Sequence, residues 1–152
     1  MARAIAVALL VSVLVAPAAM ASRPDLGKQI QQRLARASVG LDPAPWALKP
    51  TDGEPAPVEA YDGTVVSAKQ SFQMGFAVYA SEADAKAAYE YDVQQAGGLS
   101  WEGPTKEFRE GRVIYSAFIN ATGYGPGAGY GPQPTVPLKR FRALIALAQG
   151  NV

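Results

Sequence analysis

Cysteine and histidine are both absent from this sequence of 152 residues. Without cysteine the chain has no disulfide, no thiolate metal ligand and no cysteine nucleophile. Without histidine it lacks the commonest general base at neutral pH. These two absences exclude the Ser-His, Cys-His and usual zinc arrangements, so any catalysis has to use Asp, Glu, Lys, Tyr or Ser.

Nucleotide and metal motifs are also missing. The glycine-rich stretch 123–131 does not match a phosphate-binding loop, and the strand-turn-helix context of a dinucleotide site is absent. Residues 52–54 are only a fragment of a calcium loop. We therefore predict no cofactor and no metal, and we identify no catalytic motif.

The first twenty-one residues have the order of a secretory signal peptide. Arg3 precedes an apolar run at 4–15, Pro17 breaks it, and small residues at 19 and 21 form a cleavage site. An uncleaved anchor is the alternative, but the run is shorter than the ~20 residues that span a bilayer. We predict cleavage after residue 21, export to the periplasm, cell wall or medium, and no membrane span in the remaining chain.

Residues 22–152 are long enough for one domain with a single core. Without Arg3, acidic and basic residues are equal in number, which argues against a nucleic-acid binder. The charges are nevertheless segregated: residues 23–36 and 139–142 are basic, and residues 42–62 are acidic. This pattern indicates either solvated helix faces or a basic patch for an acidic envelope component or a protein partner.

Hydrophobic periodicity predicts an α+β domain with a small, mostly antiparallel sheet packed by helices. We expect strands near 71–79, 105–109 and 112–119, with a hairpin turn at Glu110-Gly111. A turn at Asp62-Gly63 precedes a candidate short strand that starts at Thr64. We expect helices near 25–38, 82–96 and 137–149.

Details of these elements can be tested individually. Ser81 should cap the second helix, Gly40 should stop the first and Gly150 the third. The predicted buried stripes are Ala85, Tyr89, Val93 and Ala96 on the second helix, and Leu138, Phe141, Leu144 or Ile145, and Ala148 on the third. Strand 112–119 carries apolar residues on both faces, as expected for a central strand covered on both sides.

Two segments do not fit a helix or a central strand. Residues 41–57 contain five prolines and predict an extended connector, with Trp46 as its anchor in the domain. Residues 121–134 repeat the motif Gly-Tyr-Gly-Pro and predict a loop. Tyrosines there either fold back on the loop or contact a peptide or sugar.

Carboxylates are the remaining catalytic candidates. Glu82, Asp84, Glu90 and Asp92 lie on one predicted helix, and Glu102, Glu107 and Glu110 lie near the hairpin. We interpret both groups as surface charges and local ion pairs. Cleavage of a glycan would need two carboxylates to face each other across a cleft, which the sequence by itself does not test.

The function hypotheses belong to three classes. The favoured one is an exported, non-catalytic module that binds a protein, peptide or envelope polymer. Its candidate contact residues are the loop aromatics and the basic C-terminal segment: Trp101, Tyr124, Tyr130, Lys139, Arg140 and Arg142. The alternatives are a small hydrolase that uses carboxylates or a Ser-Lys pair, and a structural envelope protein with basic helices on an anionic surface.

Overall fold

The computed structural model of the chain describes residues 26–49, 53–66, 70–95, 106–119 and 135–151. These residues form three α-helices and a five-stranded antiparallel sheet, which confirms the predicted α+β class. The elements are α1 (Leu26–Arg36), β1 (Asp42–Pro43), the 3-10 helix η1 (Pro45–Leu48), β2 (Glu59–Val65), β3 (Phe72–Val78), α2 (Glu82–Gln95), β4 (Lys106–Glu110), β5 (Val113–Phe118) and α3 (Leu138–Gln149).

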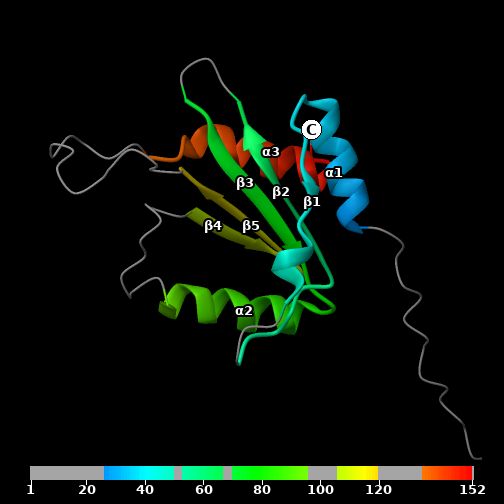
Figure 1. The fold of residues 1–152 in the computed structure, drawn as a ribbon, viewed down its shortest axis with the longest axis vertical. Coiled ribbons are helices and arrows are strands. Elements are labelled where there is room, and N and C mark those ends of the chain that lie inside the picture. Colours follow the sequence, from blue (N-terminus) through cyan, green and yellow to red (C-terminus); the bar gives the residue numbers. More distant parts are fainter. Residues whose placement is uncertain (1–25, 50–52, 67–69, 96–105, 120–134, 152) are drawn as a thin grey trace, which may run out of the picture.

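The sheet has the strand order β1-β2-β3-β5-β4, and every neighbouring pair is antiparallel. The chain leaves β3, passes through α2 and enters the edge strand β4, and β5 then fills the space between β3 and β4. Helices α1 and α3 cover one face of the sheet, and α2 lies on the other (Figure 1). We call these the α1/α3 face and the α2 face.

The main core fills the α1/α3 face. The predicted apolar alternation of strand 71–79 is confirmed, because its four apolar residues are buried in this core. Phe72 meets Phe141 of α3 edge-on at 6.4 Å between ring centroids, and Tyr61 stacks on Phe76 at 5.0 Å. Interlocking aromatic and aliphatic side chains from two helices and four strands therefore close this face.

The cap predicted for α2 is confirmed. The Ser81 hydroxyl accepts a hydrogen bond from the Asp84 backbone N–H at 3.0 Å and donates one to the Asp84 carboxylate at 2.7 Å. At the end of α3, Gly150 has a left-handed φ of 80°, as expected for a C-terminal glycine stop. The stop predicted at Gly40 is wrong, because α1 ends at Arg36 and Ser38 takes the left-handed conformation, with φ 60°.

The proline-rich connector departs from expectation at two points. Trp46 does not anchor it: this side chain is 66% exposed on η1. Asp62 and Gly63 form no turn but lie within β2, a longer strand than expected. Glycine suits position 63 because a Cβ there would meet the carbonyl oxygen of Gly40 at 2.5 Å. The connector passes over β2 at this point, which a side chain at residue 63 would prevent.

The hairpin forms one residue later than predicted. The turn residues are Gly111 and Arg112, and Gly111 has a φ of +58°, so glycine occupies the position that requires this freedom. As predicted, β5 is a central strand covered on both faces.

The helix stripes are only partly confirmed. On α3, Phe141, Leu144, Ile145 and Ala148 are buried, but Leu138 in the first turn is exposed. On α2, Ala85 and Ala88 are buried and Tyr89 is half-buried, whereas Val93 is 55% exposed. The buried stripe of α2 therefore runs through residues 85, 88 and 89 and does not include Val93. The side of the helix that faces the sheet thus differs from the predicted one.

Candidate functional site

Among the described residues, the apolar cluster on the α2 face is small. Tyr79, Ala85, Ala88 and Ile114 are buried there, with Ala77 and Tyr89 packed against them. Because α2 meets the sheet mainly through alanine methyl groups, it covers little of this face. A groove with a volume of about 170 Å³ remains between the sheet, α2 and η1.

The floor of the groove is a row of residues that crosses four strands. Asp62 on β2 pairs with Gly75 on β3, Gly75 pairs with Ser116 on β5, and Ser116 pairs with Glu107 on β4. Directly paired residues project from the same face of an antiparallel sheet. All four line the groove, so the floor has two small residues at its centre and one carboxylate toward each side.

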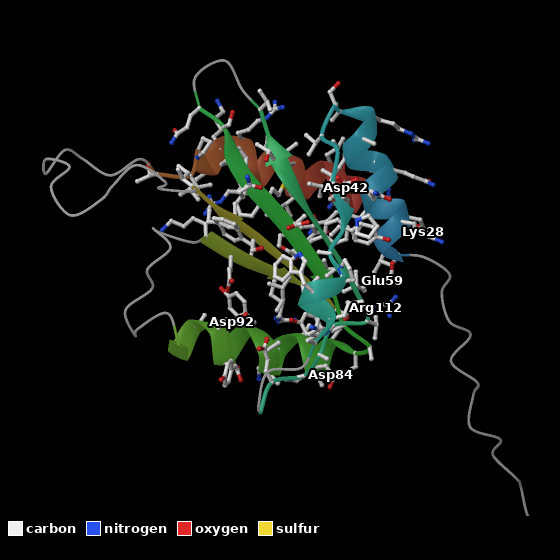
Figure 2. All side chains as sticks on the ribbon, in the orientation of Figure 1. Lys28, Asp42, Glu59, Asp84, Asp92 and Arg112 are labelled. Atoms are coloured by element: carbon white, nitrogen blue, oxygen red, sulfur yellow. The ribbon has the colours of Figure 1, made fainter. Side chains whose placement is uncertain are left out.

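Asp92 enters the groove from above the sheet. It lies one helical turn after Ala88 and two turns after Ala85, so it shares the sheet-facing side of α2 with them. Figure 2 places it on α2 between the helix and the strands, and it lines the groove. Asp92 therefore occupies a position at which an apolar side chain would complete the packing of α2 on the sheet.

The remaining wall comes from the connector and η1. Trp46 and Ala47 line the groove, and they also line an adjacent hollow of about 420 Å³ that reaches Lys49 and Glu54. Tyr79 borders both spaces. The exposed tryptophan thus separates an inner groove on the sheet from an outer, wider depression.

Burial changes the acidity of the carboxyl groups in the groove. The pKa of Glu107 is raised from 4.5 to about 7, first by burial and then by the negative charges of Asp92 and Glu54. Burial also raises the pKa of Asp92. The pKa of the Tyr79 hydroxyl rises through burial and then through Glu54, Asp92 and Glu107. The groove is therefore an environment that disfavours negative charge although three carboxylates line it.

Within the described part of the chain, the Glu107 side chain makes no hydrogen bond or ion pair. The same holds for the Asp92 side chain. Two chemical properties follow. Glu107 holds or releases a proton near neutral pH, as a general acid requires. A positively charged group placed in the groove would restore the ionised form of these carboxyls. No group of three potential metal ligands occurs among the described residues.

Of the six predicted contact residues, the three that the structure describes do not line this groove. Trp101, Tyr124 and Tyr130 lie outside the described residues. Lys139, Arg140 and Arg142 are exposed on α3, which packs on the opposite face of the sheet. The Arg142 guanidinium lies over the Phe108 ring, 5.2 Å from its centroid.

The sequence pattern predicts that the groove carboxylates are surface charges. That interpretation fits Glu90, which pairs with Lys86 at 3.6 Å on the exposed side of α2. It is wrong for Asp92 and Glu107, which are half-buried. Two features of the sequence indicate polar groups on this face: Asp92 falls four residues after Ala88 on a helical stripe, and Ser116 interrupts the second apolar face of β5.

None of the described helices is both long and apolar enough to cross a membrane. In comparisons with known proteins, the chain matches no protein family, no curated protein and no solved structure.

Proposed function

We propose that this chain is an exported, non-catalytic binding module whose ligand occupies the groove on the α2 face. The observation that carries the proposal is the row Asp62-Gly75-Ser116-Glu107, which places small residues in the floor and polar groups at the sides. Export rests on the signal-like order of residues 1–21. The absence of histidine and cysteine from the chain favours binding over catalysis.

The groove has the features by which small-molecule sites are recognised. Such sites are concave and mainly apolar, and they contain a few polar groups that orient the ligand. Here Ala77, Ile114 and Phe118 supply apolar surface, and Glu107 and Asp92 supply polar groups. Half-buried polar groups without partners lose hydration, and a ligand that offers hydrogen bonds or charge recovers that loss.

Substitutions at Ser116 test the groove as the binding site. Ser116→Leu would fill the centre of the floor, whereas Ser116→Ala removes the hydroxyl and leaves the space open. The measurement is the shift of backbone amide NMR signals in the purified chain on addition of amines, amino acids, short peptides, sugars and nucleosides.

We expect at least one compound class to shift the amide signals of residues 73–77 and 114–118 in the native chain and the alanine variant. The leucine variant should lose this response. If a compound shifts these signals equally in the leucine variant, or if no class shifts them at all, the proposal is overturned.

A second candidate function is acid–base hydrolysis. It is favoured by Glu107, which holds a proton near pH 7 and lies close enough to Asp92 for that carboxylate to raise its pKa. Two carboxyl groups with different acidities are the usual acid and base of glycan cleavage. In this scheme Glu107 would protonate the leaving group and Asp92 would activate water.

Turnover of nitrophenyl glycosides and esters between pH 5 and 8 tests this candidate. Its activity should fall as pH rises through about 7. The Glu107→Gln variant should lose at least ~100-fold in rate, which is within the range of general-acid contributions. Glu90→Gln, an equal change on the exposed side of α2, should leave the rate unchanged. Absence of turnover above buffer would remove the hydrolase.

A further inference from the structure

We propose that the ligand of this groove is an elongated organic cation, an aliphatic chain that carries an ammonium group at each end. This inference rests on the proposed binding function and specifies its ligand. The proposal rests on the geometry of the groove. Its floor consists of apolar and small residues, with Asp62 at one side and Glu107 at the other.

The row determines the length of the ligand. Asp62 and Glu107 lie on strands separated by three inter-strand steps, in the order β2-β3-β5-β4. Neighbouring strands are about 4.8 Å apart, so the Cα atoms of the two acids are about 14 Å apart. A linear diamine that lies across the strands reaches both carboxylates, whereas a compact cation reaches only one.

The floor between the acids fits a chain of methylene groups. Gly75 has no side chain, and a Cβ at this position would come within 3.5 Å of the Ser116 hydroxyl oxygen. Ala77 and Phe118 border the row on its two sides. Burial of aliphatic carbon against such surface is favourable because it removes apolar area from water. The floor thus favours an unbranched chain over a bulky or strongly hydrated one.

Charge complementarity determines the ends of the ligand. Asp62, Asp92 and Glu107 line the groove, and no lysine or arginine of the described residues does so. The neighbouring cations are directed elsewhere: Arg109 donates to the Gly111 carbonyl at 2.8 Å, and Lys86 pairs with Glu90. Lys49 lies in the outer hollow together with Glu54.

The exposed Trp46 indole adds a second kind of contact. It lies at the border of the groove and is the most exposed aromatic side chain among the described residues. An ammonium group over an aromatic face is stabilised by the ring quadrupole. A diamine chain that extends toward η1 would therefore meet an aromatic surface as well as carboxylates.

Calorimetry and NMR with a series of probes test the inference on the purified chain. The series contains putrescine, cadaverine, diaminohexane and diaminooctane, with hexylamine and hexanediol as controls that lack one or both charges. We expect the longer diamines to bind at least about tenfold more tightly than hexylamine, since each is able to reach both acids. Hexanediol should not bind detectably.

Charge-neutral variants assign the two ends. Asp62→Asn and Glu107→Gln should each reduce the affinity for diaminooctane to the level of hexylamine. Glu90→Gln removes the same charge from the exposed side of α2 and should change nothing. Diamine binding near pH 7 should also release protons, measured in buffers of different ionisation enthalpy, and Glu107→Gln should abolish this release.

The outcomes separate the ligand class from the binding function. If hexanediol or another neutral compound shifts the groove signals as strongly as the diamines, the cation inference is overturned and the binding function stands. If Glu90→Gln weakens diamine binding as much as Glu107→Gln, the attraction is a general charge effect and the inference is again overturned. If no probe in either experiment shifts the groove signals, both proposals fall.

Discussion

The two faces of the sheet are built in opposite ways. On the α1/α3 face, long apolar side chains from two helices close a core that includes Leu34, Met74, Tyr115 and Phe141. On the α2 face, the residues of α2 that are described as buried are Ala85 and Ala88, Tyr89 is half-buried, and Asp92 occupies the next position on the stripe. One face is therefore closed by a packed apolar core, whereas the other retains a groove lined by polar groups.

Charge follows the same division. Helices α1 and α3 carry six basic residues and no acidic ones: Lys28, Arg33, Arg36, Lys139, Arg140 and Arg142. Helix α2 carries Glu82, Asp84, Glu90 and Asp92 with one lysine. The two basic ends of the sequence therefore meet on one side of the sheet, where Arg33 donates a hydrogen bond to the Ala148 carbonyl at 2.8 Å.

The largest expected effect contrasts two phenylalanines. Phe141→Ala removes a fully buried ring from the α1/α3 core and should lower the free energy of unfolding by about 3–5 kcal/mol. Phe118→Ala removes a half-buried ring at the groove and should cost about 1 kcal/mol, because this ring already borders open space. Urea denaturation measures both values. Equal losses would contradict the proposed division between the faces.

The second prediction concerns the attachment of α2. Because this helix buries little apolar surface, we expect it to depend on its cap. Ser81→Ala removes the hydroxyl that accepts from the Asp84 N–H, at a cost of about 1 kcal/mol. Hydrogen exchange should show faster opening of α2 than of α3 in this variant. Ser71→Ala, at an exposed position before β3, is the control and should have no effect.

The third prediction is a pH dependence from Glu107. The unfolded chain releases this proton near pH 4.5 and the folded chain near pH 7, so between these values the folded state binds more protons. Stability should therefore fall as pH rises from about 4.5 to about 7. Glu107→Gln should remove this decline and stabilise the protein at pH 8 by about 1 kcal/mol, a value reduced for solvent screening.

Thermal unfolding of both proteins at pH 5 and pH 8 measures this difference, with Glu90→Gln as the matched control. A native protein that is more stable at pH 8 than the Gln variant would contradict the assigned burial of Glu107.

The smallest expected effect lies on the basic side. Lys139 and Arg140 occupy the first turn of α3, where positive charge opposes the helix dipole. Lys139→Glu should therefore stabilise the protein by about 0.5 kcal/mol.

If this face binds an anionic surface, as the structural-envelope hypothesis requires, the variant should also weaken salt-sensitive binding to vesicles that contain anionic lipid. Binding unaffected by salt or by this variant would remove that hypothesis.

Much of the fold could be predicted because the signals are local. Strand β3 alternates large apolar residues with polar or small ones, and Ser81 and Gly150 have the chemistry of helix ends. The prediction that Trp46 anchors the connector is wrong, because the sequence of a connector does not show whether an apolar surface lies next to its tryptophan. The turn predicted at Asp62-Gly63 is wrong because the sequence does not distinguish two reasons for a glycine. Here glycine is required by the close approach of two segments and not by a turn.

The candidate site could not be predicted, because its residues are far apart in the chain. Asp62, Asp92 and Glu107 lie on three separate elements, and each is an ordinary surface residue when considered alone. Only strand pairing aligns Asp62 with Glu107 in one row, and only the packing of α2 brings Asp92 above it.

The sequence by itself determined the α+β class, the cap of α2, the stop of α3 and the apolar face of β3, because these depend on hydrogen bonding and periodicity within a few residues. The tertiary structure decided which face of the sheet would be sealed and which would keep a groove. That choice depends on the side chains which the helices turn toward the strands. On α2 they are Ala85, Ala88 and the half-buried Tyr89, followed by Asp92, and the alanines and the aspartate are too small and too polar to fill the space.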